Sequence, residues 1–305
     1  MKKVLITGAN SYIGTSFEKY VAKKYANELT TDTVDMIDGS WRDKSFIGYE
    51  VVFHVAGIAH ADVGRVDEAT KERYYAINTR LAVETAQKAK AEGVGQFIFM
   101  SSAIIYGDSA PYGKMKVITK ETKPDPANFY GDSKLQADLG IQELADSGFL
   151  VGIVRAPMIY GKGSKGNYPA LAGMAKKLPL FPDCDNQRSM LYIENLCEFL
   201  SQAMIRGESG VFFPQNAKYS KTSELVKWIA DANGHKIQVS KALNWGVRLA
   251  SLFPGKLGSL TNKAFGNMVY DQSMSKYDFE YQLVELRESI KRSEEKSSEE
   301  SSKII

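Results

Sequence analysis

The chain of 305 residues is long enough for one large α/β domain, or for a main domain with a smaller partner. Hydrophobic residues at 44% and charged residues at 25% are ordinary for a globular protein, and the net charge of +3 is too small to indicate a nucleic-acid partner. Cys184 and Cys197 form no CxxC motif, and the chain has no histidine cluster, so we expect neither a disulfide scaffold nor a bound metal.

The first predicted elements are a buried strand at 4–6, a turn of small residues and a helix over 15–25. Such a turn leaves unpaired N–H groups at the helix start, where they can bind a phosphate. The spacing Gly-x-x-Ser-x-x-Gly puts Ser11 where a phosphate loop usually has glycine. A serine is tolerated there if its φ is negative, whereas a positive φ costs about 1 kcal/mol. An ordinary βα turn is the alternative, but the first βα unit of a doubly wound sheet is where a dinucleotide binds.

A second strand is predicted over 29–37, with Asp35 near its end, ~20 residues after the glycine loop. A carboxylate there suits the hydroxyls of an adenine ribose and repels a 2′-phosphate, which favours NAD over NADP. A surface acid in a loop is the alternative. A third buried strand, over 51–57, ends in small residues that allow a ligand to approach the backbone.

A long helix is predicted over 67–90, with the poor helix former Asn78 in its middle. Further strands are predicted over 96–100 and 149–155, and a helix over 129–147 lies between them. This alternation of strands and helices predicts an α/β fold with a Rossmann-like, doubly wound parallel sheet.

The helix over 129–147 carries Tyr130 and Lys134, which share a helix face at positions i and i+4. An ammonium beside a phenol favours the phenolate and lowers its pKa, and such a phenol can act as a base or acid on an alcohol. Ser102 follows the strand over 96–100, so its hydroxyl could share the reacting proton. A chance surface pair is the alternative for the Tyr and Lys alone.

The second half is less regular, and we expect it to form a smaller, mostly helical substrate domain. The segment 243–253 is amphipathic, and we expect its Trp245 side to face the core, with a membrane-surface helix as the alternative. No apolar run approaches the ~18 residues of a membrane span, and the run at 4–6 is too short for a signal peptide, so we expect a cytoplasmic protein. The other predicted elements here are helices over 168–177, 194–205, 222–233 and 282–292, and strands over 211–213 and 236–239.

Five stretches together resemble the extended short-chain dehydrogenase/reductase family, in the branch of NAD-dependent nucleotide-sugar epimerases and dehydratases. The resemblance covers about residues 2–290, although Ala156 stands where the family usually has proline. The stretches are 7–14, 52–57, 99–107, 130–134 and 155–161.

The resemblance implies NAD as the cofactor and assigns roles to single residues. The catalytic residues would be Ser102, Tyr130 and Lys134, with Ser102 also contacting substrate and the other two also contacting the cofactor. The remaining cofactor contacts would be Gly8, Ser11, Tyr12, Ile13 and Gly14 at the pyrophosphate; Asp35 at the adenine ribose; Ser40 and Trp41 at the adenine; Val55, Ala56, Gly57 and Asn78 along the cofactor; and Pro157 and Met158 at the nicotinamide.

The stretches 166–168 and 188–195 resemble bacterial polysaccharide-pathway enzymes, which are 4-epimerases or 4-keto reductases of UDP-N-acetylhexosamines or of their polyprenyl-diphosphate forms. By this resemblance, Asn167 and Arg188 would bind the substrate diphosphate, and a guanidinium suits phosphate oxygens. The alternative for Arg188 is an ion pair that bridges two domains.

Our first hypothesis is an NAD-dependent 4-epimerase of a UDP-N-acetylhexosamine. The alternatives are a reductase of a UDP-4-keto-6-deoxy-hexosamine, an epimerase of a polyprenyl-diphosphate sugar and a non-catalytic dinucleotide sensor. A dehydratase is disfavoured because Ala103 and Ile104 stand where the family's dehydratases have Asp and Glu.

We expect an NAD-binding domain over 1–156, to which 189–213 returns, and a substrate-binding part over 157–188 and 214–292. A disordered tail is predicted over 293–305 from its Ser, Glu and Lys content. The family often forms a homodimer through its two long helices, here those over 67–90 and 129–147, and we expect a homodimer.

Overall fold

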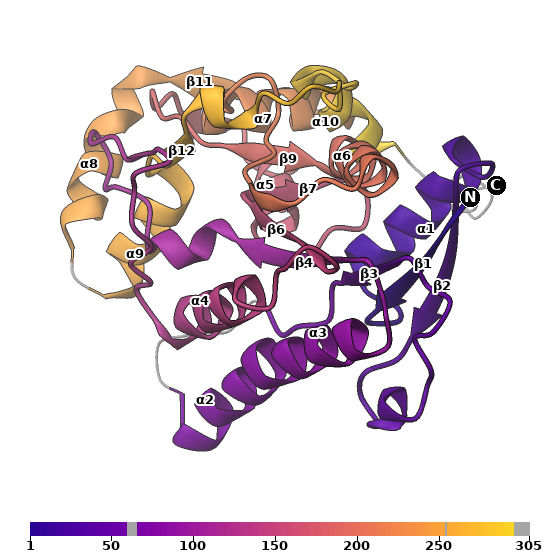
Figure 1. Cartoon of the computed structure of the whole chain (residues 1–305). Helices are drawn as coiled ribbons and strands as arrows, with labels where there is room; N and C mark the ends of the chain where they lie inside the picture. The colour runs from indigo at the N-terminus through magenta and orange to yellow at the C-terminus, as the bar shows by residue number, and fades with distance from the viewer. Residues whose placement is uncertain (60–65, 254, 296–305) are drawn as a thin grey trace.

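The computed structural model describes residues 1–59, 66–253 and 255–295, and a sheet of six parallel strands organises this part of the chain (Figure 1). β1 lies between β2 and β3, so the chain winds outward from β1 in both directions. The carboxyl ends of β1 and β3 therefore form a switch point, where such sheets bind ligands. This confirms the predicted α/β fold. The strands, in spatial order, are β2 (Leu29–Val34), β1 (Lys2–Thr7), β3 (Val51–His54), β4 (Gln96–Ser102), β6 (Leu150–Ala156) and β10 (Gly210–Phe212).

Helices cover both faces of the sheet because its strands are apolar on both sides. In β1, Val4 and Ile6 pack on one side and Leu5 on the other, as the period of two in a strand requires. The Val4 side packs against α1 (Tyr12–Lys24) and α6 (Ile193–Arg206). The Leu5 side packs against α3 (Leu81–Ala91) and α4 (Phe129–Gln142).

The helix predicted over 67–90 is interrupted. It consists of α2 (Glu68–Tyr74), a π-helical segment (Tyr75–Arg80) and α3, and Asn78 lies inside the π-helical segment. A π-helical turn holds one more residue than an α-helical turn and often marks a functional site.

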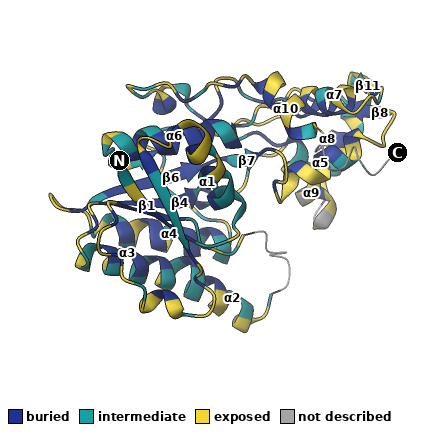
Figure 2. Ribbon diagram, turned by 90° about the vertical axis from the view of Figure 1, so that its right-hand side faces the viewer, coloured by how far each residue is buried: buried dark blue, intermediate teal, exposed yellow. Residues whose placement is uncertain are grey.

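The second half forms a separate group of helices beside the sheet, as Figure 2 shows. Its helices are α5 (Asn167–Ala175), α7 (Thr222–Ala232), α8 (Asn244–Leu252), α9 (Lys256–Phe265) and α10 (Leu286–Glu294). Short parallel pairs join distant segments: β5 (Val117–Ile118) with β12 (Val269–Tyr270), β7 (Met158–Tyr160) with β9 (Met190–Tyr192), and β8 (Leu180–Pro182) with β11 (Gln238–Ser240). Single 3-10 turns are formed by Ser40–Arg42, Ala103–Tyr106, Lys241–Leu243 and Gln272–Ser275.

Two expectations about the second half are wrong. Ser293 and Glu294 belong to α10, where Ser293 is buried, so the predicted tail begins too early; residues 296–305 lie outside the described part. The Trp245 side of α8 does not face the core, because the Trp245 side chain is 72% exposed. Within the described residues, none of the helices has both the length and the apolar character that crossing a bilayer requires. The division into domains stays a prediction.

Candidate active site

The glycine loop between β1 and α1 has the backbone geometry of a phosphate-binding turn. Gly8 has a φ of +109°, and a Cβ there would lie 2.9 Å from the backbone nitrogen of Ala56, so only glycine fits between the ends of β1 and β3. Ser11 has a φ of −70°, which answers the question of strain, because serine adopts this value freely. Its Oγ accepts a hydrogen bond from the Gly14 backbone N–H at 3.1 Å and so caps α1.

The Ser11 side chain also explains why residue 14 is a glycine, because a Cβ at position 14 would lie 2.6 Å from the Ser11 Oγ. Ser11, Tyr12 and Ile13 line the large cavity that is described below, whereas Gly8 and Gly14 stand behind it. The Tyr12 hydroxyl is buried without a hydrogen-bond partner among the described residues.

The residues expected at the adenosine lie apart from that cavity, at the carboxyl end of β2. Asp35 follows the strand and is exposed, and its Oδ1 accepts a hydrogen bond from the Ile37 N–H at 2.9 Å. Ser40 is exposed in the next turn. The Trp41 side chain is buried in the core, with 1% exposed, so it can offer an adenine only its backbone.

The segment after β3 is held against α4 by Asn78. The Asn78 side chain is buried, accepts from the Ile58 N–H at 2.8 Å and donates to the Ile58 carbonyl and the Ser133 hydroxyl, each at 3.1 Å. A Cβ at Gly57 would lie 3.0 Å from the Asn78 Oδ1 and 3.1 Å from the Lys134 Nζ. The glycine thus allows the backbone after β3 to approach the polar groups of both helices closely. Val55 and Gly57 line the cavity, and Ala56 packs against Gly8.

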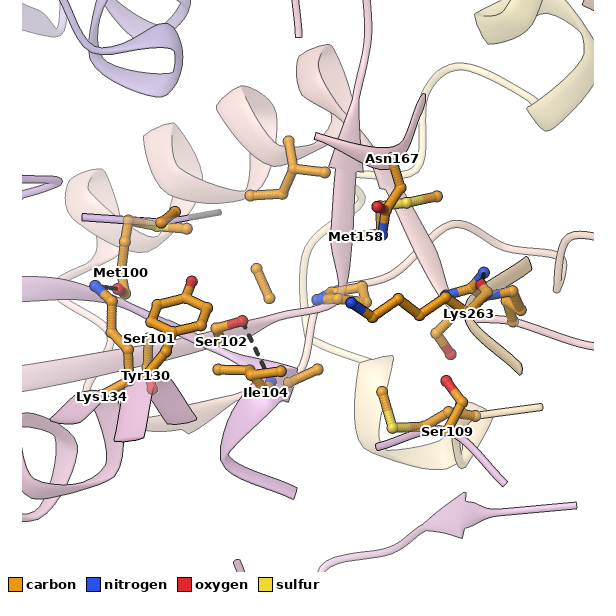
Figure 3. Close-up of a pocket in the computed structure, with 18 of the residues that line it drawn as sticks. Met100, Ser101, Ser102, Ile104, Ser109, Tyr130, Lys134, Met158, Asn167 and Lys263 are labelled. Atoms are coloured by element: carbon orange, nitrogen blue, oxygen red, sulfur yellow. Dashed lines mark hydrogen bonds between the residues drawn. The ribbon is translucent and has the colours of Figure 1, made fainter. Parts of the chain in front are cut away.

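Ser102, Tyr130 and Lys134 come together on one wall of the cavity (Figure 3). Ser102 ends β4, and its Oγ accepts from the Ile104 N–H at 3.3 Å, which leaves the hydroxyl proton free to be donated. Tyr130 and Lys134 lie on α4, which Asn128 caps. The Lys134 Nζ donates to the Met100 carbonyl at 3.2 Å.

Burial sets the pKa values of Tyr130 and Lys134. It raises the pKa of Tyr130 to about 12, with a smaller contribution from Tyr74, and lowers the pKa of Lys134 to about 8. The expected lowering of the Tyr130 pKa by the neighbouring ammonium is therefore wrong for the chain itself, because desolvation of the phenolate dominates. At neutral pH both groups are protonated.

A buried ionic network behind these three residues was not predicted. Asp138 lies one turn beyond Lys134 and accepts from the Ser101 hydroxyl at 2.6 Å. It also accepts from the Arg155 Nε at 3.0 Å and Nη2 at 2.8 Å. Arg155 donates to the Tyr106 hydroxyl at 2.8 Å. The network fixes the ends of β4 and β6 relative to α4, and therefore the distance between Ser102 and Tyr130.

The cavity has a volume of about 950 Å³ and lies between the sheet and the second half of the chain. Pro157 and Met158 line it after β6, and Asn167 lines it at the start of α5. The N–H groups at the start of a helix favour an anion. Among the described residues, its charged lining residues are Lys134, Lys165, Arg188 and Lys263, against one carboxylate, that of Asp108. The cavity therefore suits an anionic ligand.

Arg188 is the cation best placed for phosphate. Its Nη1 donates to the Lys263 backbone carbonyl, and burial lowers its pKa. Among the described residues no carboxylate forms an ion pair with Arg188, so the alternative of a domain-bridging ion pair is not observed there. A half-buried guanidinium that lines a cavity without a counter-charge among the described residues favours an anionic ligand. Ser164, also missed in the sequence, lines the cavity with a buried hydroxyl that lacks a partner among the described residues.

These features define the class of the protein. Residues 4–212 match the NAD dependent epimerase/dehydratase family, and the chain belongs to it. The chain is an NAD-dependent epimerase or oxidoreductase, and its cofactor is NAD. It is 26% identical over 298 residues to the UDP-glucose 4-epimerase of Vibrio cholerae. The alignment covers 90% of this chain and 89% of that protein.

A second relative is N-acetyl-alpha-D-glucosaminyl-diphospho-ditrans,octacis-undecaprenol 4-epimerase of Escherichia coli O157:H7, with 28% identity over 214 residues, 65% of this chain and 61% of that protein. Solved structures share the fold. UDP-glucuronic acid 4-epimerase from Bacillus cereus in complex with NAD has a TM-score of 0.70, 16% identity and coverage of 96% and 97%. dTDP-4-dehydrorhamnose reductase from Bacillus anthracis in complex with NADP has a TM-score of 0.72, 18% identity and coverage of 96% and 98%.

The residues present fit NAD. Ser11, Tyr12 and Ile13 at the start of α1 line the same cavity as Tyr130 and Lys134, so one ligand can reach from the glycine loop to the Tyr130–Lys134 pair. Which side chains contact the cofactor stays a prediction.

Proposed function

We propose that the protein is an NAD-dependent epimerase that acts at carbon 4 of a diphosphate-linked N-acetylhexosamine, with UDP as the carrier. The observation that carries the proposal is the cavity itself, which has Ser102, Tyr130 and Lys134 on one wall and the half-buried Arg188 among its other lining residues. If Arg188 binds the diphosphate of the substrate, a hydroxyl of the sugar ring would face the cavity wall that Ser102, Tyr130 and Lys134 form.

In this proposal, Tyr130 first loses its own proton to solvent. The phenolate oxygen then takes the proton of the carbon-4 hydroxyl and later returns it, and Ser102 donates a hydrogen bond to the carbon-4 oxygen. When bound, NAD would supply the acceptor for the hydride of carbon 4 and would later return that hydride. Lys134 holds positive charge beside the phenol, which favours the phenolate. Arg188 and Asn167 hold the diphosphate while the keto sugar turns.

A reductase of a UDP-4-keto-6-deoxy-hexosamine is the second candidate, and one observation favours it. Because burial keeps Tyr130 protonated at neutral pH, the chain is prepared to donate a proton to a carbonyl oxygen. A reductase needs only that step, whereas an epimerase also needs the reverse one. The exposed Asp35 supports NAD held through its ribose hydroxyls, which suits an epimerase.

The test is to incubate the purified protein with UDP-GlcNAc, without added cofactor, and to look for UDP-GalNAc. Product supports the epimerase. No product, together with NADH consumption on a UDP-4-keto-6-deoxy-hexosamine, supports the reductase, and bound NAD without either turnover supports a sensor.

Tyr130→Phe should lower the turnover at least about 100-fold, because it removes the group that carries the proton. Tyr75→Phe is the matched control, since its hydroxyl bonds Asp132 and neither residue lines the cavity. Full turnover in Tyr130→Phe would exclude the proposed role of the phenol. The homodimer and the cytoplasmic location stay predictions.

A further inference from the structure

One exposed surface has the properties of a docking site. Six large apolar side chains of α8, α9 and their connection gather on what we call the α8–α9 face, and each is at least 50% exposed. A soluble chain rarely leaves such side chains together in water. The face consists of Trp245, Leu249, Leu252, Phe253, Leu257 and Leu260.

The two helices present these side chains as one surface. Trp245, Leu249 and Leu252 are spaced i, i+4 and i+7, so they share one side of α8, while Val247 is buried on the other side. α8 packs against α9, where Leu257 and Leu260 are one turn apart. Figure 1 shows both helices at one end of the molecule, away from β1 and β2. In Figure 2, α9 lies at the margin of the second half and carries exposed residues.

The segment that carries the face has charges of one sign, while Asp183 lies near Lys241 from the chain after β8. Residues 232–270 contain five lysines and arginines and no aspartate or glutamate. Lys241 and Arg248 are exposed, and Arg248 lies one turn from Trp245 at the edge of the apolar stripe. An apolar stripe bordered by cations, with a tryptophan among its apolar side chains, matches the boundary between lipid headgroups and acyl chains.

We propose that the α8–α9 face docks on an anionic lipid bilayer. A second copy of the chain is a poorer occupant, because a twofold contact would bring the same cations of both copies together. Anionic headgroups supply the missing negative charge, and each lysine or arginine near them contributes about 1 kcal/mol.

The docking face and the candidate active site share α9. Asn262 and Lys263 line the cavity from this helix, and the Lys263 backbone carbonyl accepts a hydrogen bond from Arg188. Leu257 and Leu260 lie one to two turns before these residues, on the exposed surface. A diphosphate held at Arg188 would therefore lie next to a helix that reaches the bilayer.

The inference about the carrier of the sugar rests on the proposed function. If the cavity holds a sugar diphosphate, a docked α9 would allow a polyprenyl chain to serve as the carrier in place of uridine, because the chain can run along Leu260 and Leu257 into the membrane. The bilayer docking itself depends on neither the reaction nor the sugar.

The test uses the full-length protein with saturating NAD and two kinds of vesicle, phosphatidylcholine alone and phosphatidylcholine with about one-third phosphatidylglycerol. We expect co-sedimentation with the anionic vesicles that weakens as salt is raised, and much weaker binding to the neutral ones. Brominated lipids should quench the fluorescence of Trp245. Since Trp41 is buried in the core and Trp228 on α7 is half-buried, Trp245→Phe should remove most of this quenching.

The combined variant Trp245→Ser, Leu252→Ser and Leu260→Ser should lower the partition coefficient at least about tenfold. The matched control changes Ile47→Ser and Leu283→Ser, which are 72% and 45% exposed elsewhere on the surface, and should bind vesicles like the original chain. Binding of NADH by both variants shows that they are folded.

Equal vesicle binding by the combined variant and the original chain, or no binding to anionic vesicles by the original chain, would overturn the proposal. So would a homodimer that the combined variant converts to a monomer, because a second copy would then cover the face. Failure of the proposed function is recognised separately, as absence of turnover by a protein that still binds vesicles. Turnover of a polyprenyl-diphosphate sugar in these vesicles, with none of UDP-GlcNAc, supports the lipid carrier.

Discussion

At the scale of the residue, the buried ammonium of Lys134 lowers the stability of the folded chain. Its side chain is buried, its pKa is lowered from 10.5 to about 8, and its Nζ has the Met100 carbonyl as a hydrogen-bond partner. The difference between these two pKa values corresponds to about 3 kcal/mol. Below pH 8, where Lys134 is charged in the folded chain, the free energy of unfolding is lower by this amount.

Lys134→Met should therefore raise the free energy of unfolding at pH 7 by about 1–2 kcal/mol, after about 1 kcal/mol is subtracted for the lost hydrogen bond. The unfolded chain binds more protons than the folded chain between pH 8 and 10.5, so the original protein gains stability as pH rises through this range. The advantage of the variant should be complete below pH 8 and should vanish by about pH 10.5. Urea unfolding at several pH values measures it, and a variant that is less stable at every pH would contradict the buried-ammonium interpretation.

Among single residues, those at the ends of strands could be predicted from the sequence, because strand, turn and helix leave local signals. Gly8 and Ser102 are such residues: Gly8 directly follows β1, and Ser102 is the last residue of β4. Asp138 could not be found in this way. Its partner Arg155 is 17 residues away on another element, and a buried ion pair has no periodicity. The predicted lowering of the Tyr130 pKa was also wrong, because the spacing of Tyr130 and Lys134 does not show how deeply the phenol is buried.

At the scale of the element, the π-helical segment has a structural task that can be tested through Asn78. Asn78→Ala should lower the free energy of unfolding by about 2–3 kcal/mol, because it leaves the N–H and carbonyl of Ile58 without their partner. Arg80→Ala in the same segment is the control, since its ion pair with Glu72 is exposed and is worth at most about 0.5 kcal/mol. Chemical denaturation of both variants measures the difference. A loss in Asn78→Ala no larger than in the control would mean that the loop after β3 is held by other contacts.

Entire elements were predicted well where apolar periodicity is strong and poorly where long-range contacts decide. All six strands of the sheet were recognised, five of them from apolar runs and β2 (LTTDTV) from a weaker pattern. α9 was missed because glycines at its start weaken the helical pattern, and a Cβ at Gly258 would overlap the Phe253 carbonyl. The short pairs such as β5 with β12 join segments about 150 residues apart, which no local pattern reveals. An amphipathic pattern also predicts an apolar side without showing what covers it, hence the wrong expectation for Trp245.

At the scale of the whole molecule, α10 ties the end of the described chain to the second half through Glu294. The Glu294 carboxylate is 4% exposed; it accepts from the Tyr168 hydroxyl and the Asn233 amide, each at 2.9 Å, and pairs with Lys176 at 2.8 Å. Deleting 293–305 removes this carboxylate and leaves the Tyr168 hydroxyl without it, so we expect a loss of about 2–4 kcal/mol in the free energy of unfolding. Deleting only 296–305 keeps every one of these contacts and should leave the midpoint of urea unfolding unchanged. Glu294→Gln, which keeps the shape but not the charge, should lie between the two. The same midpoint for both deletions would show that the second half is stable without the end of α10, and would return residue 293 to the tail that the composition predicts.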